Sequence, residues 1–265
     1  MDTKFSTRLY TPVVTRVIAI ANQKGGVAKT TTTHTVGVAL ARLGERVLLV
    51  DLDPQGCLSF SLGLDPDSLE LSMHDVLTGR NKADDIIVQV DDVSVLPTNI
   101  ELAGAEMQLL TRTGREYTLA RALASLTECF DTILIDCAPT LGVLTVNGLT
   151  AAKEVLIPLQ CEALSHRGVA QLLDTINDVR EFTNPQLRVR GAIATMFDSR
   201  TRHAREVVED VRARFGIEVL DPPIPKSVRF AEAPSQSVTI LDHAPKSPGA
   251  LAYQAIAATL HADKI

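Results

Sequence analysis

Tryptophan is absent from the 265-residue chain, and aromatic residues make up only 4% of it. A core of this composition must be built from aliphatic side chains, and the 45% hydrophobic content is enough for one sizeable core. Cysteine is also scarce: the four cysteines stand far apart, without a CxxC pair or a nearby histidine at metal-ligand spacing. This spacing argues against a disulfide framework or a zinc site and favours reduced thiols in the cytoplasm.

Long apolar runs and an excess of positive charge are lacking as well. No stretch approaches the roughly 18 apolar residues of a membrane span, and residues 1–16 carry polar and charged side chains where a signal peptide needs apolar ones. The 32 acidic and 26 basic residues give a net charge of -6, so a polyanion would bind only at a local patch. We therefore expect a cytoplasmic protein without stable membrane association.

Internal repeats, low-complexity segments and Gly/Ser-rich linkers are not seen, which favours a single domain. Residues 1–16 contain few apolar positions, and we expect them to form a flexible N-terminal tail. The domain is then predicted to span residues 17–265.

The chain does contain a series of short apolar runs separated by helical patterns. The runs are typical of strands buried on both faces of a parallel sheet, and they begin at residues 17, 47, 93, 132, 154 and 188. Apolar spacing predicts helices over residues 30–43, 100–110, 116–126, 141–151, 165–181, 204–215 and 248–261. This alternation predicts an α/β fold with a doubly wound, mostly parallel sheet flanked by helices, which binds ligands at the carboxyl ends of its strands.

A glycine-rich loop lies between the first predicted strand and the first predicted helix, where residues 22–31 read NQKGGVAKTT. Its glycines allow backbone N–H groups to point at phosphate oxygens, and the helix N-terminus adds its positive dipole end. Lys29 supplies a charge for the β and γ phosphates, and the hydroxyl of Thr30 suits Mg²⁺. A glycine-rich turn with a chance Lys-Thr pair is the simpler alternative. The predicted nucleotide-binding residues of the loop are Lys24, Gly25, Gly26, Val27, Ala28, Lys29, Thr30 and Thr31.

The order K-G-G-x-x-K-T, with its second lysine at Lys24, resembles the deviant Walker A motif of the ParA/MinD ATPases, and VLLVDLDPQG at residues 47–56 is similar to the ParA/Soj branch. The resemblance implies a P-loop NTPase that hydrolyses ATP to ADP and phosphate with Mg²⁺, weakly unless a partner and DNA stimulate it. It also implies that Lys24 reaches across an ATP-sandwiched homodimer to the partner's nucleotide. From the residues alone, Lys24 is equally well a solvated loop lysine.

One position departs from the family pattern, because Ala28 stands where glycine usually precedes the P-loop lysine. If the φ angle of Ala28 is positive, strain of roughly 1 to 3 kcal/mol follows, and if it is negative, the cost is small. This departure raises the alternative of a scaffold that does not respond to nucleotide. The intact remainder of the loop favours a working ATP site.

Three aspartates follow predicted strands at the edge of the sheet that faces the loop. In the resembled family the carboxylate before the proline orients the attacking water, which implies that role for Asp53. Asp51 either stabilises the Mg²⁺ shell or caps the following turn, and the sequence leaves both roles open. Asp136 ends its apolar run as a Walker B residue does, and we expect it to meet Mg²⁺ through water. Lys24, Lys29 and Asp53 are the predicted catalytic residues.

The segment PIPKSVRFAEAPS at residues 223–235 is similar to the ParA/Soj segment that contacts adenine. By that resemblance Pro225 and Ser227 line the base, although the family more often carries asparagine at the position of Ser227 and arginine at that of Lys226. Met196, at the end of its predicted strand, is either a neighbour of the adenine or a core residue.

Positive charge gathers late in the chain, where five arginines between residues 188 and 205 stand against one acid. The resemblance implies that such arginines bind the DNA backbone without reading its sequence. A solvated helix face, with arginines paired to nearby glutamates, is the alternative. The predicted DNA-binding residues are Arg200, Arg202, Arg205, Lys226 and Arg229.

The resemblance implies an ATP-driven switch that binds nonspecific double-stranded DNA as a dimer and segregates a chromosome or plasmid. The resemblance implies a ParB-like stimulatory partner and a nucleoid-associated ATP-bound state. An alternative cargo is a protein assembly positioned on the nucleoid. A MinD-like membrane-surface regulator is a further alternative, but ALAYQAIAATLHADKI, with Lys264 as its firm cation, lacks the basic amphipathic helix this requires.

Overall fold

The computed structural model describes residues 15–161 and 165–263, and the strands of this part form a single sheet. The spatial order is β3-β4-β2-β5-β1-β6-β7-β8, and every neighbouring pair is parallel except β3 with β4. The strand bounds are β1 Arg16–Ile20, β2 Val47–Leu52, β3 Val88–Val90, β4 Val93–Leu96, β5 Thr132–Cys137, β6 Glu154–Gln160, β7 Arg188–Thr195 and β8 Val219–Leu220. The predicted doubly wound, mostly parallel sheet is confirmed.

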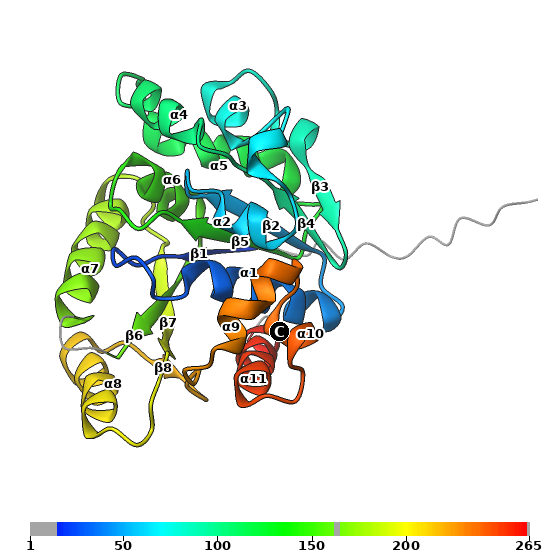
Figure 1. Ribbon diagram of the computed structural model, residues 1–265. Helices are drawn as coiled ribbons and strands as arrows, with labels where there is room; N and C mark the ends of the chain where they lie inside the picture. The colour runs from blue at the N-terminus through cyan, green and yellow to red at the C-terminus, as the bar shows by residue number, and fades with distance from the viewer. Residues whose placement is uncertain (1–14, 162–164, 264–265) are drawn as a thin grey trace, which may run out of the picture.

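Helices cover both faces of the sheet (Figure 1). Their bounds are α1 Lys29–Arg42, α2 Cys57–Ser61, α3 Met73–Thr78, α4 Leu102–Leu109, α5 Thr118–Leu123, α6 Val143–Ala151, α7 Ser165–Phe182, α8 Arg202–Phe215, α9 Arg229–Glu232, α10 Ile240–His243 and α11 Pro248–Ala262. Short 3₁₀ turns are η1 Pro66–Ser68, η2 Ala83–Ile86, η3 Arg115–Tyr117, η4 Ala124–Leu126 and η5 Ala233–Gln236.

Two hydrophobic cores lie on opposite faces of the sheet. The first packs α3 to α8 against the sheet, and the second packs α1, α2, α10 and α11 against it. Strands β1, β2 and β5 are buried along their whole length because their Val, Ile and Leu side chains alternate between these two cores. Strands β2 to β5 lie on one side of β1 in the sheet, and strands β6 to β8 lie on the other. The carboxyl ends of β1 and its neighbours therefore lie at a topological switch point, where such sheets bind ligands.

The start of the domain differs from the predicted boundary. Strand β1 begins at Arg16, and both Thr15 and Arg16 are buried, so these two residues belong to the domain and not to a flexible tail. The reason is a distant partner: Nε of Arg16 donates to the buried carboxylate of Glu154 at 2.5 Å. The rest of the predicted tail, residues 1–14, lies outside the described residues.

The predicted helix over residues 116–126 is also shorter than expected. The α-helical part covers only Thr118–Leu123, with 3₁₀ turns on either side. The side chain of Asn147 in α6 accepts from the backbone N of Leu119, so a neighbouring helix caps the first turn of α5. Among residues 15–161 and 165–263, no helix combines the length and apolar character that a membrane span requires.

Candidate functional site

The glycine-rich loop connects β1 to the N-terminus of α1, as predicted. Its conformation depends on two residues in the left-handed region, Gly26 with φ 73° and Ala28 with φ 69°. The carbonyl of Ala28 accepts from the backbone N of Thr32 at 2.9 Å and so begins the helix. Because the φ angle of Ala28 is positive, the conditional strain of roughly 1 to 3 kcal/mol applies to this chain.

The metal side of the site joins α1 to the end of β5. The hydroxyl of Thr30 donates to Oδ2 of Asp136 at 2.7 Å, and the hydroxyl of Thr33 donates to Oδ1 at 3.3 Å. Asp136 is only 1% exposed, and burial raises the pKa of its carboxyl. A carboxylate and a hydroxyl are the hard oxygen donors that Mg²⁺ prefers, so this pair fits the ion, which would neutralise charge that burial disfavours.

Asp51 lies near the end of β2 and Asp53 directly follows this strand, but their surroundings differ. Asp51 is fully buried; its carboxylate accepts from the backbone N and the hydroxyl of Ser59 at 2.8 and 2.7 Å, and from the backbone N of Asp53 at 3.3 Å. Burial raises the pKa of Asp51 to about 7. Of the two roles left open for Asp51, these bonds show the capping one, and a role toward Mg²⁺ stays a prediction. Asp53 lines the cavity described below.

The two loop lysines contact each other. Nζ of Lys29 donates to the carbonyl O of Lys24 at 3.2 Å, and Nζ of Lys24 donates to Oε1 of Gln160 at 3.1 Å. Lys29 is 7% exposed, and burial lowers the pKa of its ammonium, opposed first by the charge of Asp136. The Lys29 side chain is therefore a partly desolvated cation beside the loop, where phosphate oxygens would find few competing water molecules.

A cavity of about 890 Å³ opens beside the loop. Such a volume lies within the usual range of small-molecule sites. Of the predicted nucleotide-binding residues, the cavity is lined by Gly25, Gly26, Ala28, Lys29, Thr30, Thr31, Met196, Pro225 and Ser227. The cavity lining does not include Lys24 or Val27.

The base side of this cavity is tied to the phosphate loop. The hydroxyl of Thr195, the last residue of β7, donates to the carbonyl of Val27 at 3.1 Å. Met196 follows with φ 49°, and it lines the cavity, so the reading of this residue purely as core packing does not hold. A bridge between Phe197 and Pro225 brings the segment after β8 alongside.

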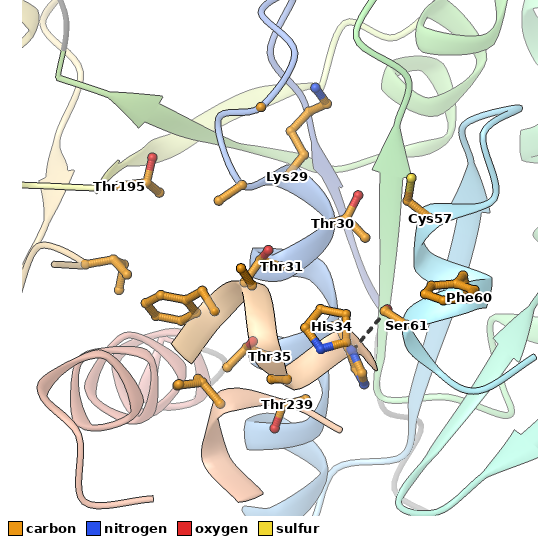
Figure 2. Close-up of a pocket in the computed structure, with 18 of the residues that line it drawn as sticks. Lys29, Thr30, Thr31, His34, Thr35, Cys57, Phe60, Ser61, Thr195 and Thr239 are labelled. Atoms are coloured by element: carbon orange, nitrogen blue, oxygen red, sulfur yellow. Dashed lines mark hydrogen bonds between the residues drawn. The ribbon is translucent and has the colours of Figure 1, made fainter. Parts of the chain in front are cut away.

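Several wall residues were missed by sequence reasoning. Figure 2 shows Thr31, His34 and Thr35 descending one face of α1, with Phe60 and Ser61 of α2 opposite and Thr239 below. Nδ1 of His34 lies 3.2 Å from the hydroxyl of Ser61, and burial lowers the pKa of His34 to about 4. One signal was present in the sequence, since His34 and Thr35 stand four residues after Thr30 and Thr31 and thus share their helix face.

The predicted DNA-binding side chains lie on exposed surface around α8 and α9. Three of them form ion pairs within the chain: Arg200 with Asp198 at 2.8 Å, Arg202 with Glu206 at 2.6 Å, and Arg229 with Glu232 at 3.0 Å. Arg205 is exposed on α8, and Lys226 lines the cavity. Exposed pairs of this kind contribute about 0 to 1 kcal/mol, so a phosphate group can replace the carboxylate.

Comparison with known proteins identifies the family. A family model described as an AAA domain (AAA_31) matches residues 15–189. The sporulation initiation inhibitor protein Soj of Bacillus subtilis is 43% identical over 240 residues, covering 90% of this chain and 95% of that protein. The chromosome partitioning protein ParA of Caulobacter vibrioides is 44% identical over 246 residues, covering 91% and 92%.

Solved structures agree with the fold and with the expected ATP and magnesium. One solved structure, from Mycobacterium smegmatis, is described as cobyrinic acid a,c-diamide synthase with bound ATP analog and magnesium. Its sequence is 55% identical, the match covers 94% of this chain and 95% of that chain, and the TM-score is 0.84. The cell division ATPase MinD of Pyrococcus furiosus is 28% identical, covers 93% and 98%, and has a TM-score of 0.75. The chain therefore belongs to the ParA/Soj family of P-loop ATPases, and it hydrolyses ATP with Mg²⁺ as cofactor.

Proposed function

We propose that this ATPase is a DNA-partition switch that forms an ATP-sandwiched homodimer, binds nonspecific double-stranded DNA and is reset by hydrolysis. The observation that carries the proposal is the joined arrangement of Thr30 and Asp136 beside a cavity lined by the phosphate loop and Asp53, in a chain related over nine-tenths of its length to Soj and ParA. Segregation of a chromosome or plasmid is the outcome proposed for the switch.

Each site residue has a proposed task. Bound Mg²⁺ would supply charge neutralisation between the phosphates, and Thr30 and Asp136 are the residues that would hold it. Lys29 binds phosphate oxygens, and Asp53 orients the attacking water. One carboxylate oxygen of Asp53 already accepts from the backbone N of Gln55 at 3.1 Å, which fixes the orientation of the group. Phosphoryl transfer depends mainly on such positioning.

The partners follow from the same proposal. In the dimer, Lys24 contacts the partner's nucleotide, and the arginines near α8 and α9 contact DNA phosphates. A ParB-like protein stimulates hydrolysis and releases the dimer from DNA, so the ATP-bound state is associated with the nucleoid in the cytoplasm. A protein cargo positioned on the nucleoid would use the same chemistry, and only the identity of the partner distinguishes it.

The first experiment measures the DNA-bound fraction of the wild-type protein and of Asp53→Ala, with ATP, ADP or no nucleotide, on unrelated DNA sequences at two salt concentrations. We expect binding that requires ATP, ignores sequence and weakens with salt. Asp53→Ala should retain or strengthen it because hydrolysis is blocked. Absence of DNA binding in every nucleotide state, with ATP binding confirmed, would exclude the DNA switch.

A second candidate comes from the description of the Mycobacterium smegmatis structure, which is 55% identical to this chain. ATP-dependent amidation of cobyrinic acid would use the same ATP site but a different second substrate. Incubation with cobyrinic acid, an ammonia donor and Mg-ATP, followed by mass spectrometry, distinguishes the two. A mass change that matches amide formation would favour this candidate over the partition switch.

The MinD-like alternative finds less support. Helix α11 packs against α1, and its apolar side chains Tyr253, Ile256 and Leu260 are buried in the second core. These side chains are therefore not available to a membrane surface in this structure.

A further inference from the structure

Lys24 is held within its own chain at three of its atoms. Its backbone N donates to Oδ1 of Asn22 at 3.0 Å, and its side-chain Nζ donates to Oε1 of Gln160 at 3.1 Å. Its carbonyl O accepts from Nζ of Lys29 at 3.2 Å. The main chain and the side chain of this lysine are thus both positioned by neighbours.

Two of these contacts depend on the end of β6. Asn22 is 4% exposed, and its Nδ2 donates to the carbonyl of Pro158 at 2.7 Å. Gln160 is the last residue of β6, which pairs with β1 in the sheet. Because β6 is buried between β1 and β7, it provides a rigid support for the resting position of Lys24.

The third contact involves the phosphate-binding lysine. The Lys29 ammonium that donates to the carbonyl of Lys24 is the group that binds phosphate oxygens in the proposed function. An anionic oxygen is a stronger acceptor for an ammonium than a neutral carbonyl. Filling of the phosphate site therefore draws Lys29 away from Lys24 and leaves the loop at Lys24 with one contact fewer.

We propose that Gln160 is a positioning residue that keeps the Lys24 ammonium in its own chain, and that occupation of the phosphate site loosens this hold so that Lys24 can reach a second copy of the chain. The inference rests on the proposed function, because that function assigns Lys24 to the partner's nucleotide. Gln160 thereby sets the threshold at which nucleotide binding becomes dimer formation.

The first test needs no dimer. Full-length protein without nucleotide is labelled with an amine-reactive reagent, and the rate at Lys24 is measured by peptide mass spectrometry relative to the exposed Lys82. We expect Gln160→Ala to raise the Lys24 rate about 2- to 10-fold, the range that one ordinary hydrogen bond corresponds to. Gln160→Glu should lower it because an ion pair replaces a neutral contact. Gln254→Ala, at an exposed position of α11, is the matched control and should leave the rate unchanged.

The same labelling with Mg-ADP tests the coupling. ADP supplies phosphates to Lys29, but the proposed dimer requires ATP. With ADP, a change in the Lys24 rate therefore reflects the single chain and not dimer formation. The Lys24 rate should rise in the wild-type protein and rise less in Gln160→Ala. Equal Lys24 rates in wild type and Gln160→Ala without nucleotide would overturn the positioning role, and an ADP-induced rise of equal size in both would overturn the coupling.

The second test is a double-mutant cycle on ATP-dependent dimerisation, followed by analytical ultracentrifugation, with melting temperatures as a check on folding. Gln160→Ala should lower the ATP concentration at half-maximal dimerisation about 2- to 10-fold when Lys24 is present. It should have no effect when Lys24 is replaced by alanine. An equal shift in both backgrounds means that Gln160 acts only through general structure and overturns the inference.

The two proposals fail in different ways. If Lys24→Ala forms the ATP dimer as readily as the wild-type protein, the proposed contact of Lys24 with the partner's nucleotide is wrong. If the wild-type protein forms no ATP dimer, the proposed homodimer itself is wrong. The labelling rates at Lys24 still decide whether Gln160 holds this side chain.

Discussion

The hydroxyl of Thr30 donates to Oδ2 of Asp136 at 2.7 Å and so joins the first turn of α1 to the end of β5. These residues are 106 positions apart in the chain, but Thr30 comes after β1 and Asp136 lies in β5, and these two strands pair with Ile20 opposite Asp136. The hydrogen bond holds a buried carboxylate where a metal ion beside the phosphate loop would need it.

Replacement of Asp136 by asparagine should therefore weaken the response to Mg²⁺. The amide preserves the shape of the side chain but removes its charge, and loss of an outer-shell metal partner typically costs about 10- to 100-fold in affinity or activity. The measurement is ATPase rate against Mg²⁺ concentration. Thr30→Ser, which keeps a hydroxyl, is the control and should retain most of the response; an unchanged Mg²⁺ midpoint in Asp136→Asn would contradict the assignment.

Replacement of Ala28 by glycine should not destabilise the protein. At φ 69° the strain at Ala28 costs about 1 to 3 kcal/mol, and glycine removes this cost while adding about 0.5 to 1 kcal/mol of unfolded-state entropy. We expect unchanged or slightly higher stability in urea unfolding. Ala258→Gly, at an exposed position inside α11, should instead lose about 1 kcal/mol. Equal losses in the two variants would show that Ala28 is unstrained.

Ala28 shows the limit of what the sequence could predict about this site. Strand runs ending in aspartates and the glycine-rich loop between a strand and a helix are local patterns, and they placed Asp136 at the end of β5, Asp53 directly after β2 and the phosphate loop between β1 and α1. The φ angle of Ala28 is not a local pattern, because alanine adopts either sign depending on what surrounds it. Only the folded loop settles whether its methyl group is strained.

Distant partners explain the other differences. The sequence predicts that Arg16 belongs to the flexible tail because its partner Glu154 lies 138 residues away in the chain. Strand β8 has two residues, too few for a periodic signal, although it aligns the segment that carries Pro225 beside Phe197. The lower wall of the cavity combines α1, α2 and residues after α9, and no spacing within one segment indicates that these elements meet.

His34 should make the protein less stable in mild acid. Its folded pKa of about 4 lies below the unfolded value near 6.5, so the folded protein binds fewer protons at this site. The stabilisation that depends on neutral His34 is complete above about pH 6.5 and is lost as the pH falls toward 4. Between pH 8 and pH 5 this one group should remove about 2 kcal/mol from the free energy of unfolding.

The comparison that isolates this effect is His34→Gln, which keeps a polar group near Ser61 but does not titrate. Other groups titrate in both proteins, including Asp51 with its raised pKa, so the difference between the two urea-unfolding curves is the relevant quantity. That difference should change with pH in the stated direction. Parallel pH profiles would mean that His34 does not carry the effect.

Arg202 should contribute to DNA binding through phosphate contact alone. Its side chain is 87% exposed and pairs with Glu206 four residues later on α8, an arrangement that a DNA phosphate can replace at little cost. Arg202→Ala should weaken binding equally on unrelated DNA sequences and reduce the slope of log affinity against log salt by about 0.9. The measurement is ATP-dependent DNA affinity at several salt concentrations.

Arg115→Ala, which removes another paired surface arginine near α5, should leave the slope unchanged. A slope that falls equally in both variants would mean that net charge, and not the surface around α8, determines binding.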